Sequence, residues 1–283
     1  MTEIRRVGVI GAGQMGRGIA QVCAQAELEV WLNDASEAAL TQGLARIKAD
    51  LDKLVDRQKL EAGSRDKILA RLHPAPKLED IATCNYIVEA AIENVDAKLA
   101  IFRELDDRAA PDAILASNTS SISLTKIAGA TRRPERVIGM HFMNPVPLMR
   151  LVEVVRALQT DDATYKATCA LAEKLGKVLV TTKDMPGFIV NRMLIPFLNE
   201  ACFALQEGLG SIHDIDQGAK LGLNHPMGPF ELADLIGLDT CLYISEVLHT
   251  EFGEDKYRPP TLLRNYVAAG WLGRKTKKGF YEY

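Results

Sequence analysis

The sequence predicts an α/β fold: a doubly wound, mostly parallel sheet with a helical hairpin excursion, followed by an all-α C-terminal domain. Short β-branched runs alternate with helical patterns, and the early runs are almost continuously apolar, as strands buried on both faces of a parallel sheet must be. After Pro186 and Gly187 no convincing strand follows until the last few residues. We therefore expect domains at residues 1–186 and 187–283.

The strands of the first domain are expected in order along the chain. Helical patterns between the early runs form strand-helix-strand units, which are the connections that a doubly wound sheet needs. The predicted strands are Arg5–Gly11, Leu28–Asp34, Cys84–Ala91, Ala113–Asn118, Arg136–Phe142, Met149–Val155 and Lys177–Thr182.

One connection is longer than a plain crossover. From Glu37 onward apolar residues recur at three- and four-residue steps, which predicts an amphipathic helix. A second short helix is expected around Asp66–Leu72, ending before Pro74. In the second domain, helices are predicted over Ile189–Glu207, Asp214–Leu221 and Phe230–Thr250.

Composition narrows the class of protein. The chain has 283 residues, 47% of them hydrophobic and 25% charged, as in a soluble globular protein, and a net charge of −3 argues against a nucleic-acid or membrane-surface binder. Its five cysteines are widely spaced and lack histidines at zinc-ligand spacing, so we expect reduced thiols and no metal site. Without an apolar signal segment or a long apolar run, the sequence predicts a cytoplasmic protein.

A glycine-rich turn near the N-terminus predicts a nucleotide site. In "VGVIGAGQMGRGIA", Gly11, Gly13 and Gly16 have G-x-G-x-x-G spacing directly between a strand and a helix, the context that a Rossmann-type site requires. Gly11 permits the tight turn, Gly13 lets a pyrophosphate approach and Gly16 allows close packing of helix on strand. The expected cofactor contacts in this turn are Gly11, Ala12, Gly13, Gln14, Met15 and Gly16.

Asp34 ends the second predicted strand. A carboxylate there can accept hydrogen bonds from the adenosine ribose diol and would repel a 2′-phosphate, which favours NAD over NADP. The alternative is that Asp34 serves as a helix N-cap, a role that Ser36 could equally fill.

A histidine and a glutamate stand out in the apolar stretch "IGMHFMNPVPLMRLVEVV". A buried ionised carboxylate needs a partner, and if Glu153 pairs with His141 the two form an acid-base device. The alternative is two unrelated residues, one at a strand end and one on an exposed face. His141 ends a strand on the same edge as the glycine turn, which favours a functional role.

Several longer motifs carry a family resemblance. "GAGQMGRGIA", "LASNTSS", "GMHFMNPVPLMRLVEVV", "PGFIVNR", "NHPMGPFELADLIGLD" and "GRKTKKGFYEY" resemble the 3-hydroxyacyl-CoA dehydrogenase family, especially its short-chain bacterial members, the 3-hydroxybutyryl-CoA dehydrogenases. The motifs run from Gly11 to Tyr283 and so cover essentially the whole chain. The resemblance implies that His141 is the general acid/base and that Glu153 orients it.

The resemblance also implies roles for other polar residues. Asn191 would contact the substrate oxygen or orient His141, although a helix-initial Asn is by pattern alone more often a cap. Ser120 would contact substrate and cofactor, although such a loop is by itself a polar turn. The remaining implied cofactor contacts, which as bare residues would be turn or solvated surface positions, are Glu93, Lys98, Asn144 and Lys275.

Coenzyme A carries phosphates, so a basic patch is expected. The family holds CoA with the helical excursion, and on it Lys53 and Arg57 lie four residues apart. Acidic residues interleave with these bases, a pattern that is also typical of an ordinary solvated helix face. The resemblance further implies a homodimer formed through the second domain, with no nucleic-acid or membrane partner.

Three functions follow in order of preference. The first is NAD-dependent interconversion of (S)-3-hydroxybutyryl-CoA and acetoacetyl-CoA. The second is a related dehydrogenase of a small non-CoA hydroxy acid such as gulonate. The third is a non-catalytic, crystallin-like NAD-binding protein, which the presence of Ser120, His141, Glu153 and Asn191 together disfavours.

Overall fold

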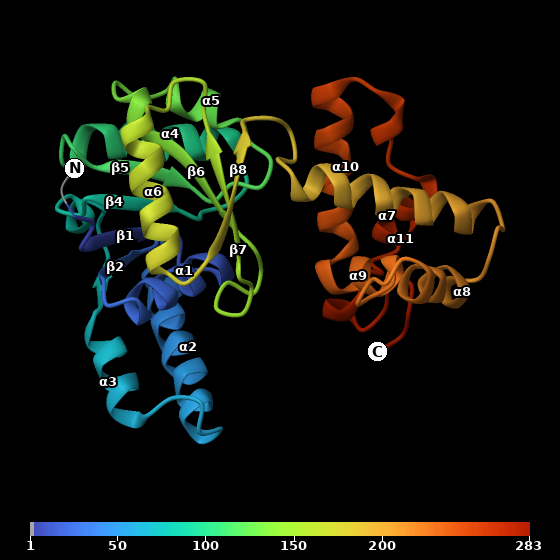
Figure 1. Cartoon of the computed structure of the whole chain (residues 1–283), viewed down its shortest axis with the longest axis horizontal. Helices are drawn as coiled ribbons and strands as arrows, with labels where there is room; N and C mark the ends of the chain where they lie inside the picture. The colour runs from blue at the N-terminus through green and yellow to red at the C-terminus, as the bar shows by residue number, and fades with distance from the viewer. Residues whose placement is uncertain (1–2) are drawn as a thin grey trace. The chain divides into compact units, whose positions relative to one another are not determined.

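The structure is a computed structural model that describes residues 3–283. The chain forms two compact units, the first ending at Met185 and the second running from Pro186 to Tyr283. Figure 1 shows that the first unit contains the sheet and that the second is built from helices.

A single twisted sheet organises the first unit. Within residues 3–283 its strand order is β3-β2-β1-β4-β5-β6-β7-β8, and neighbours are parallel except for the antiparallel pair β6 and β7. The order reverses between β1 and β4, which makes the crevice outside the carboxyl ends of these strands the expected ligand site. The strands are β1 Arg6–Ile10, β2 Glu29–Asn33, β3 Leu72–Ala75, β4 Tyr86–Glu89, β5 Ile114–Ser117, β6 Val137–Phe142, β7 Leu151–Arg156 and β8 Val178–Lys183.

Helices cover the sheet and extend beyond it. Every residue of β4, β5 and β6 is buried, as the continuous apolar runs predict. Figure 1 shows α6 crossing the near face of the sheet, and the hairpin of α2 and α3 projecting from its end. The helices of this unit are α1 Gln14–Gln25, α2 Glu37–Asp56, α3 Ala62–Ala70, α4 Val95–Arg108, α5 Leu124–Ala128 and α6 Asp162–Lys174.

The excursion forms because its first helix is both capped and amphipathic. The Ser36 hydroxyl accepts a hydrogen bond from the Ala39 backbone N–H at the start of α2. Leu40, Ile47 and Leu51 then bury one stripe of this helix in the core of the first unit. The predicted helical excursion is therefore confirmed.

The structure corrects the prediction after α3. We expected a helix around Asp66–Leu72, but the helix begins at Ala62, ends at Ala70 and is followed by the short strand β3. Pro74 lies inside β3. A proline disfavours a strand because it has no backbone N–H to donate to the hydrogen-bond ladder. It is tolerated here because β3 is the edge strand of the sheet, with a partner only on the β2 side.

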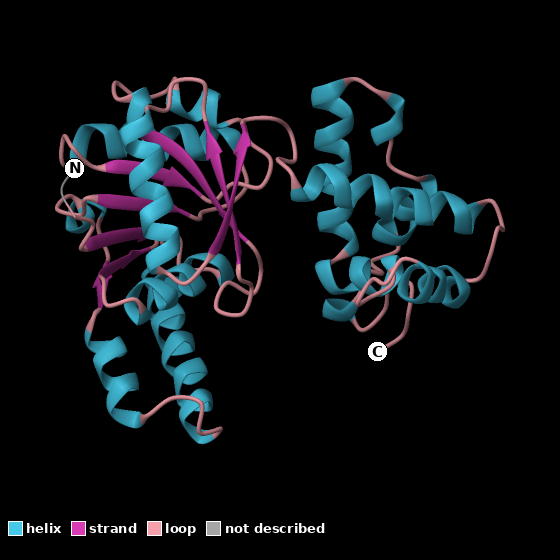
Figure 2. Cartoon of the chain, in the orientation of Figure 1, coloured by secondary structure: helices cyan, strands magenta, loops and turns pink. Residues whose placement is uncertain are grey.

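The second unit is helical (Figure 2), but its helices differ from the prediction in two places. The single helix expected over Phe230–Thr250 is divided at Gly237, whose φ of 104° is incompatible with a continuing helix. Helix α11 was not predicted. The helices are α7 Val190–Gln206, α8 Ile212–Gln217, α9 Pro229–Ile236, α10 Leu238–Phe252 and α11 Thr261–Ala268.

Short turns complete both units. A π turn extends α8 over Gly218–Gly222, close to the predicted helix end at Leu221. Isolated bridges join Gly273 to Lys278 and Lys278 to Glu282 at the C-terminal end. Turns of 3₁₀ type lie at Leu78–Ile81, Pro134–Arg136, Asp255–Tyr257 and Arg274–Thr276. No helix within residues 3–283 is long and apolar enough to cross a membrane.

Two buried aspartates fasten the C-terminal tail onto the second unit. Asp234 is 1% exposed and accepts hydrogen bonds from the Phe280 and Tyr281 backbone N–H groups, both at 2.9 Å. Asp216 accepts one from the Tyr281 hydroxyl at 2.8 Å. Because buried polar groups are costly to leave unpaired, these two carboxylates hold the tail in place.

The tail clamp gives a first prediction. Replacing Asp234→Ala leaves the buried Phe280 N–H and the partly buried Tyr281 N–H without their acceptor and should lower the free energy of unfolding by about 3 kcal/mol. Glu282→Ala, which removes only an ion pair whose glutamate side chain is 81% exposed, is the matched control and should change nothing measurable. Urea denaturation followed by circular dichroism checks this, and equal stability of the two variants would contradict the clamp.

Candidate functional site

The glycine turn has the backbone geometry that a dinucleotide site needs. Gly11 has a φ of 97°, and a Cβ on Gly16 would lie 1.7 Å from the Gly11 carbonyl oxygen. At Gly13, by contrast, a Cβ would have nothing within 4 Å, and this residue is the N-cap of α1. The turn therefore presents an open backbone and the N-terminal N–H groups of a helix.

Asp34 connects the end of β2 to the glycine turn. Its Oδ2 accepts a hydrogen bond from the Ala12 N–H at 2.8 Å, and its Oδ1 accepts one from the Ser36 N–H at 2.9 Å. Ser36 is the N-cap of α2, so the capping alternative for Asp34 is wrong. A carboxylate has about four lone-pair sites, so about two remain for further hydrogen-bond donors.

The loop between β6 and β7 reaches the start of α1. The Gln14 side-chain amide donates to Asn144 Oδ1 at 2.9 Å. On the other side of the loop, Lys177 Nζ donates to the carbonyls of Val146 and Met149 at 2.6 and 2.8 Å. Burial lowers the pKa of Lys177. These contacts fix Asn144 beside the glycine turn.

His141 and Glu153 lie opposite each other on neighbouring strands. The antiparallel register of β6 and β7 pairs these two residues directly. Glu153 Oε2 is 2.7 Å from His141 Nδ1, and the side chains are 0% and 9% exposed. The alternative of two unrelated residues is therefore wrong. The contact directs the Nε2 edge of the ring away from Glu153 and selects the orientation of the imidazole.

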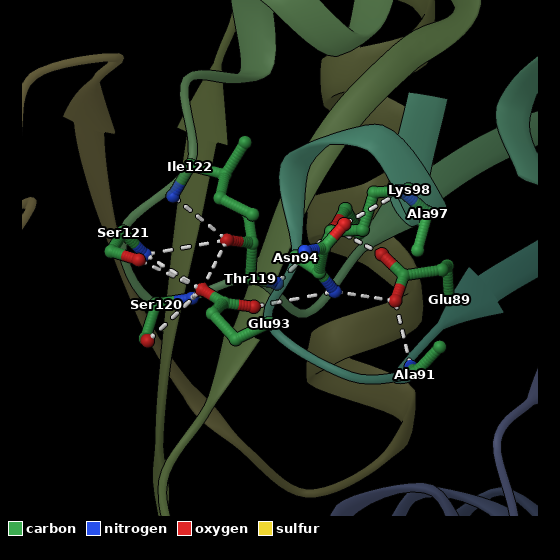
Figure 3. Close-up of polar contacts among 11 residues, drawn as sticks. Glu89, Ala91, Glu93, Asn94, Ala97, Lys98, Thr119, Ser120, Ser121 and Ile122 are labelled. Carbon is green, nitrogen blue, oxygen red and sulfur yellow. Dashed lines mark hydrogen bonds and ion pairs between the residues drawn. The ribbon is translucent and has the colours of Figure 1, made fainter. Parts of the chain in front are cut away.

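Glu93 accepts hydrogen bonds from several groups of the loop that follows β5. Its Oε1 accepts hydrogen bonds from the Thr119 hydroxyl at 2.6 Å, the Ser120 N–H at 2.9 Å and the Ser121 N–H at 3.1 Å (Figure 3). The Ser120 and Ser121 hydroxyls add contacts at 3.2 and 3.0 Å. Burial alone would raise the pKa of Glu93, but Lys98 and these donors outweigh it and lower the pKa, so this carboxylate stays ionised.

Lys98 is buried between two carboxylates. Its Nζ lies 2.5 Å from Glu89 Oε1 and 3.3 Å from Glu93 Oε2, and its side chain is only 1% exposed. The interpretation of Lys98 as a solvated surface charge is therefore wrong.

Sequence reasoning missed Glu89, although a signal was present. Glu89 interrupts the apolar run "YIVEAA" as Glu153 interrupts the later one. A charge in a buried strand calls for a partner, and the same argument applied here points to a cation nearby. Only the fold shows that the partner is Lys98, one helical turn into α4.

The remaining predicted residues lie elsewhere. In the second unit, Asn191 is the second residue of α7 and 8% exposed; Ile189 is the N-cap, so the capping alternative for Asn191 is wrong. Lys275 is exposed and pairs with Asp239 at 2.5 Å.

In the excursion Lys53 pairs with Asp50 at 3.0 Å, which bears out the interleaving of charges. Arg57 is exposed at the C-cap of α2 and, within residues 3–283, forms no ion pair.

The polar residues of the first unit follow the carboxyl ends of parallel strands. Asp34 follows β2, Glu93 follows β4, Ser120 follows β5 and His141 lies near the end of β6. They flank the point where the strand order reverses. Within residues 3–283 no cluster of three His, Cys, Asp or Glu side chains has the makings of a metal site.

A glycine turn opening a helix at the switch point of a doubly wound sheet defines a dinucleotide-binding α/β protein. Comparison with protein families specifies it further. Residues 6–185 match the NAD-binding domain of 3-hydroxyacyl-CoA dehydrogenase, and residues 187–283 match its C-terminal domain. The chain belongs to the 3-hydroxyacyl-CoA dehydrogenase family, and its first unit is the family's NAD-binding domain.

Relatives cover the full chain. A 3-hydroxybutyryl-CoA dehydrogenase of Bradyrhizobium diazoefficiens is 53% identical over 99% of this chain and 96% of its own length. The crystal structure of (S)-3-hydroxybutyryl-CoA dehydrogenase from Ralstonia eutropha has a TM-score of 0.96 and 51% identity, covering 99% of both chains. A diketoreductase structure has a TM-score of 0.88 and 30% identity, covering 100% of both chains.

The two glycines of the turn predict different effects for the same substitution. Gly16→Ala forces a methyl group onto the Gly11 carbonyl and should destabilise the first unit by about 3 kcal/mol. Gly13→Ala has open space and an extended backbone with φ of −66°, so it should fold with wild-type stability. Thermal unfolding of both variants checks this, and a destabilised Gly13→Ala would contradict the open geometry of the turn.

Proposed function

We propose that the protein interconverts (S)-3-hydroxybutyryl-CoA and acetoacetyl-CoA with NAD as hydride carrier and with His141 and Glu153 as a general acid/base pair. The observation that carries the proposal is the 2.7 Å contact between the two side chains at the nucleotide edge of the sheet. Full-length relatives that are named for this reaction support the choice of substrate.

His141 moves the proton in this reaction. In oxidation its imidazole takes the proton of the substrate's 3-hydroxyl, and in reduction it returns a proton to the same oxygen. NAD held by the glycine turn and Asp34 would supply the acceptor, or in reduction the donor, of the hydride at C3. Glu153 stabilises the imidazolium that forms and keeps the ring in one tautomer, because its carboxylate accepts a hydrogen bond from the Nδ1–H group. Such a base typically contributes about 10²–10⁴-fold.

The residues present fit a bound dinucleotide. The open Gly13 backbone and the start of α1 suit the pyrophosphate, with Ala12, Gln14 and Met15 in the same turn. Asp34 suits the adenosine ribose diol. On the other side of the strand-order reversal, the proposed contacts of the nicotinamide half are Glu93, Lys98, Ser120 and Asn144. Lys275 is proposed as a further cofactor contact.

Ser120 and Asn191 are the proposed contacts of the substrate oxygen. The Ser120 hydroxyl is held by Glu93 at 3.2 Å, and its loop is fixed by two further backbone donors. Asn191 is placed within the first turn of α7, where the helix itself fixes its backbone. The Asn191 side chain carries N–H donors, which suits an oxygen that gains negative charge during reduction. The Ser120 hydroxyl donates to Glu93, so its oxygen is left to accept a hydrogen bond from the substrate's 3-hydroxyl.

Lys53 and Arg57 are the proposed contacts of the CoA phosphates. They lie near the far end of α2, and a cavity lined by α1, α2 and the β6–β7 loop leads from Leu54 past Arg17 to Asn144. A pantetheine arm is mostly apolar with two amides, and the cavity offers both apolar and polar walls. Asp50 and Leu54, which line this cavity, lie on α2 close to Lys53 and Arg57 in sequence.

The second unit is proposed to form a homodimer. It exposes large apolar side chains, with Leu209 81% and Leu221 82% exposed, and pairing with a second copy would remove such side chains from water. A cytoplasmic location is proposed alongside, and the five cysteines are all unpaired, as suits a reducing compartment.

A carbonyl substrate without CoA is the alternative function. It is favoured by the likeness to a diketoreductase structure at 30% identity. A gulonate-type hydroxy acid would belong to the same class. A non-catalytic, crystallin-like role is disfavoured, because a structural protein has no need of a buried histidine paired with a carboxylate.

Turnover with acetoacetyl-CoA tests the proposal. We expect NADH oxidation at 340 nm by the wild type, and a loss of about 10²–10⁴-fold in kcat for His141→Ala with unchanged NADH binding. NADPH should be a poor cofactor because Asp34 repels its 2′-phosphate. Turnover retained in His141→Ala would contradict the role of the base. Tight NADH binding without turnover would contradict the CoA substrate and favour small hydroxy acids.

The CoA contacts are tested separately. Lys53→Ala combined with Arg57→Ala should raise KM for acetoacetyl-CoA about tenfold, since each loses a charge-assisted phosphate contact. KM for acetoacetyl-pantetheine, which lacks the nucleotide phosphates, should not change. Lys48→Ala is the matched control on the same helix, where Lys48 pairs with Asp52 at 2.6 Å. An equal rise in KM for both substrates would show that Lys53 and Arg57 do not contact the CoA phosphates.

A further inference from the structure

Glu89 is a fully buried carboxylate that no step of the proposed reaction uses. It is the last residue of β4 and 0% exposed. Its Oε2 accepts a hydrogen bond from the Ser117 hydroxyl at 2.6 Å, and its Oε1 accepts one from the Ala91 N–H at 2.7 Å. Ser117 ends β5 and stands beside Glu89 in the ladder. The carboxylate therefore joins the ends of two strands at the switch-point edge.

The strongest partner of Glu89 is Lys98. The Lys98 ammonium is 2.5 Å from Glu89 and 3.3 Å from Glu93, so the shorter contact belongs to the carboxylate that is more deeply buried. An unpaired ammonium at this depth is strongly disfavoured, and one lysine here serves two carboxylates. Glu89 therefore determines where the ammonium lies.

Glu93 faces two sets of donors at once. Its Oε2 points to Lys98, while its Oε1 takes the hydroxyl and N–H groups of residues 119–121 (Figure 3). The balance between these sets fixes the carboxylate, and with it the Ser120 hydroxyl. A continuous chain of contacts therefore runs from Glu89 through Lys98 and Glu93 to Ser120.

We propose that Glu89 is a positioning residue for the nicotinamide half of the site: by holding Lys98, it leaves Glu93 oriented toward the loop that carries Ser120. The inference deepens the proposed function and rests on it for the roles of Glu93 and Ser120. Without the charge of Glu89, the Lys98 ammonium has Glu93 as its one carboxylate partner in this chain of contacts. It then draws Glu93 away from the loop, which loses its shared acceptor.

Glu89→Gln tests the proposal, with Asp106→Asn as the matched control. Asp106 is also a buried carboxylate, 5% exposed, and it lies on the same helix as Lys98. It pairs with Arg132 and Arg133 near the opposite end of that helix. Both substitutions remove one buried negative charge and keep the side-chain shape, but only Glu89 is linked to Glu93.

The affinities for two ligands distinguish a local effect of Glu89 on the nicotinamide half from a general loss of structure in the first unit. ADP-ribose engages the glycine turn and Asp34, whereas NADH also engages the nicotinamide half. For Glu89→Gln we expect the Kd of NADH to rise about tenfold and the Kd of ADP-ribose to stay within about twofold of wild type. In Asp106→Asn both constants should stay unchanged. Weakening of both ligands in Glu89→Gln, or of neither, would overturn the proposal.

Turnover gives a second readout. If acetoacetyl-CoA is the substrate, kcat/KM of Glu89→Gln should fall about 10²-fold because Ser120 is displaced, at a temperature where both variants are folded. If the wild type fails to turn this substrate over, the proposed function is wrong, and the ligand-binding comparison still decides the role of Glu89.

A conservative variant covers the case in which Glu89→Gln does not fold. Glu89→Asp keeps the charge and shortens the side chain by one methylene, so Lys98 can follow it only part of the way. We expect the Kd of NADH to rise about threefold with unchanged ADP-ribose binding. Wild-type affinity for both ligands in this variant would overturn the proposal.

Discussion

The site depends on one constraint: charges buried at the carboxyl edge of a parallel sheet must each find a partner there. Glu89 and Glu153 are both 0% exposed, and each is satisfied by a side chain on a neighbouring element. Because a buried unpaired carboxylate is costly, the folded state requires these contacts. The same contacts that satisfy the fold therefore fix the geometry of the groups proposed to act in catalysis.

The change of strand direction between β6 and β7 gives the histidine its partner. Two parallel strands would need a long crossover connection between them. The antiparallel strands β6 and β7 are joined by a single loop, and their ladder places His141 directly across from Glu153. The connecting loop then returns to α1, where Asn144 meets Gln14. One short segment of chain thus supplies the proposed base, the carboxylate paired with it and a side chain beside the glycine turn.

Much of the fold could be predicted because the signals were local. The apolar runs, the glycine spacing and the periodicity of α2 each depend on neighbouring residues, and these elements appear as expected. β3 was missed because its four residues include a proline that only an edge position permits. The division at Gly237 was missed because a single glycine within an apolar helical pattern is usually tolerated.

The candidate site was predictable in its residue types and less so in its contacts. A glutamate in an apolar strand predicts that the folded protein provides it with a partner, but the identity of that partner depends on which elements are neighbours. Glu153 finds a histidine because β7 pairs with β6, and Glu89 finds a lysine because α4 begins beside β4 and β5. Equivalent sequence signals thus lead to different chemistry. One carboxylate faces an imidazole, which can take up and give back a proton, while the other faces a lysine ammonium and is suited to holding Glu93 in place.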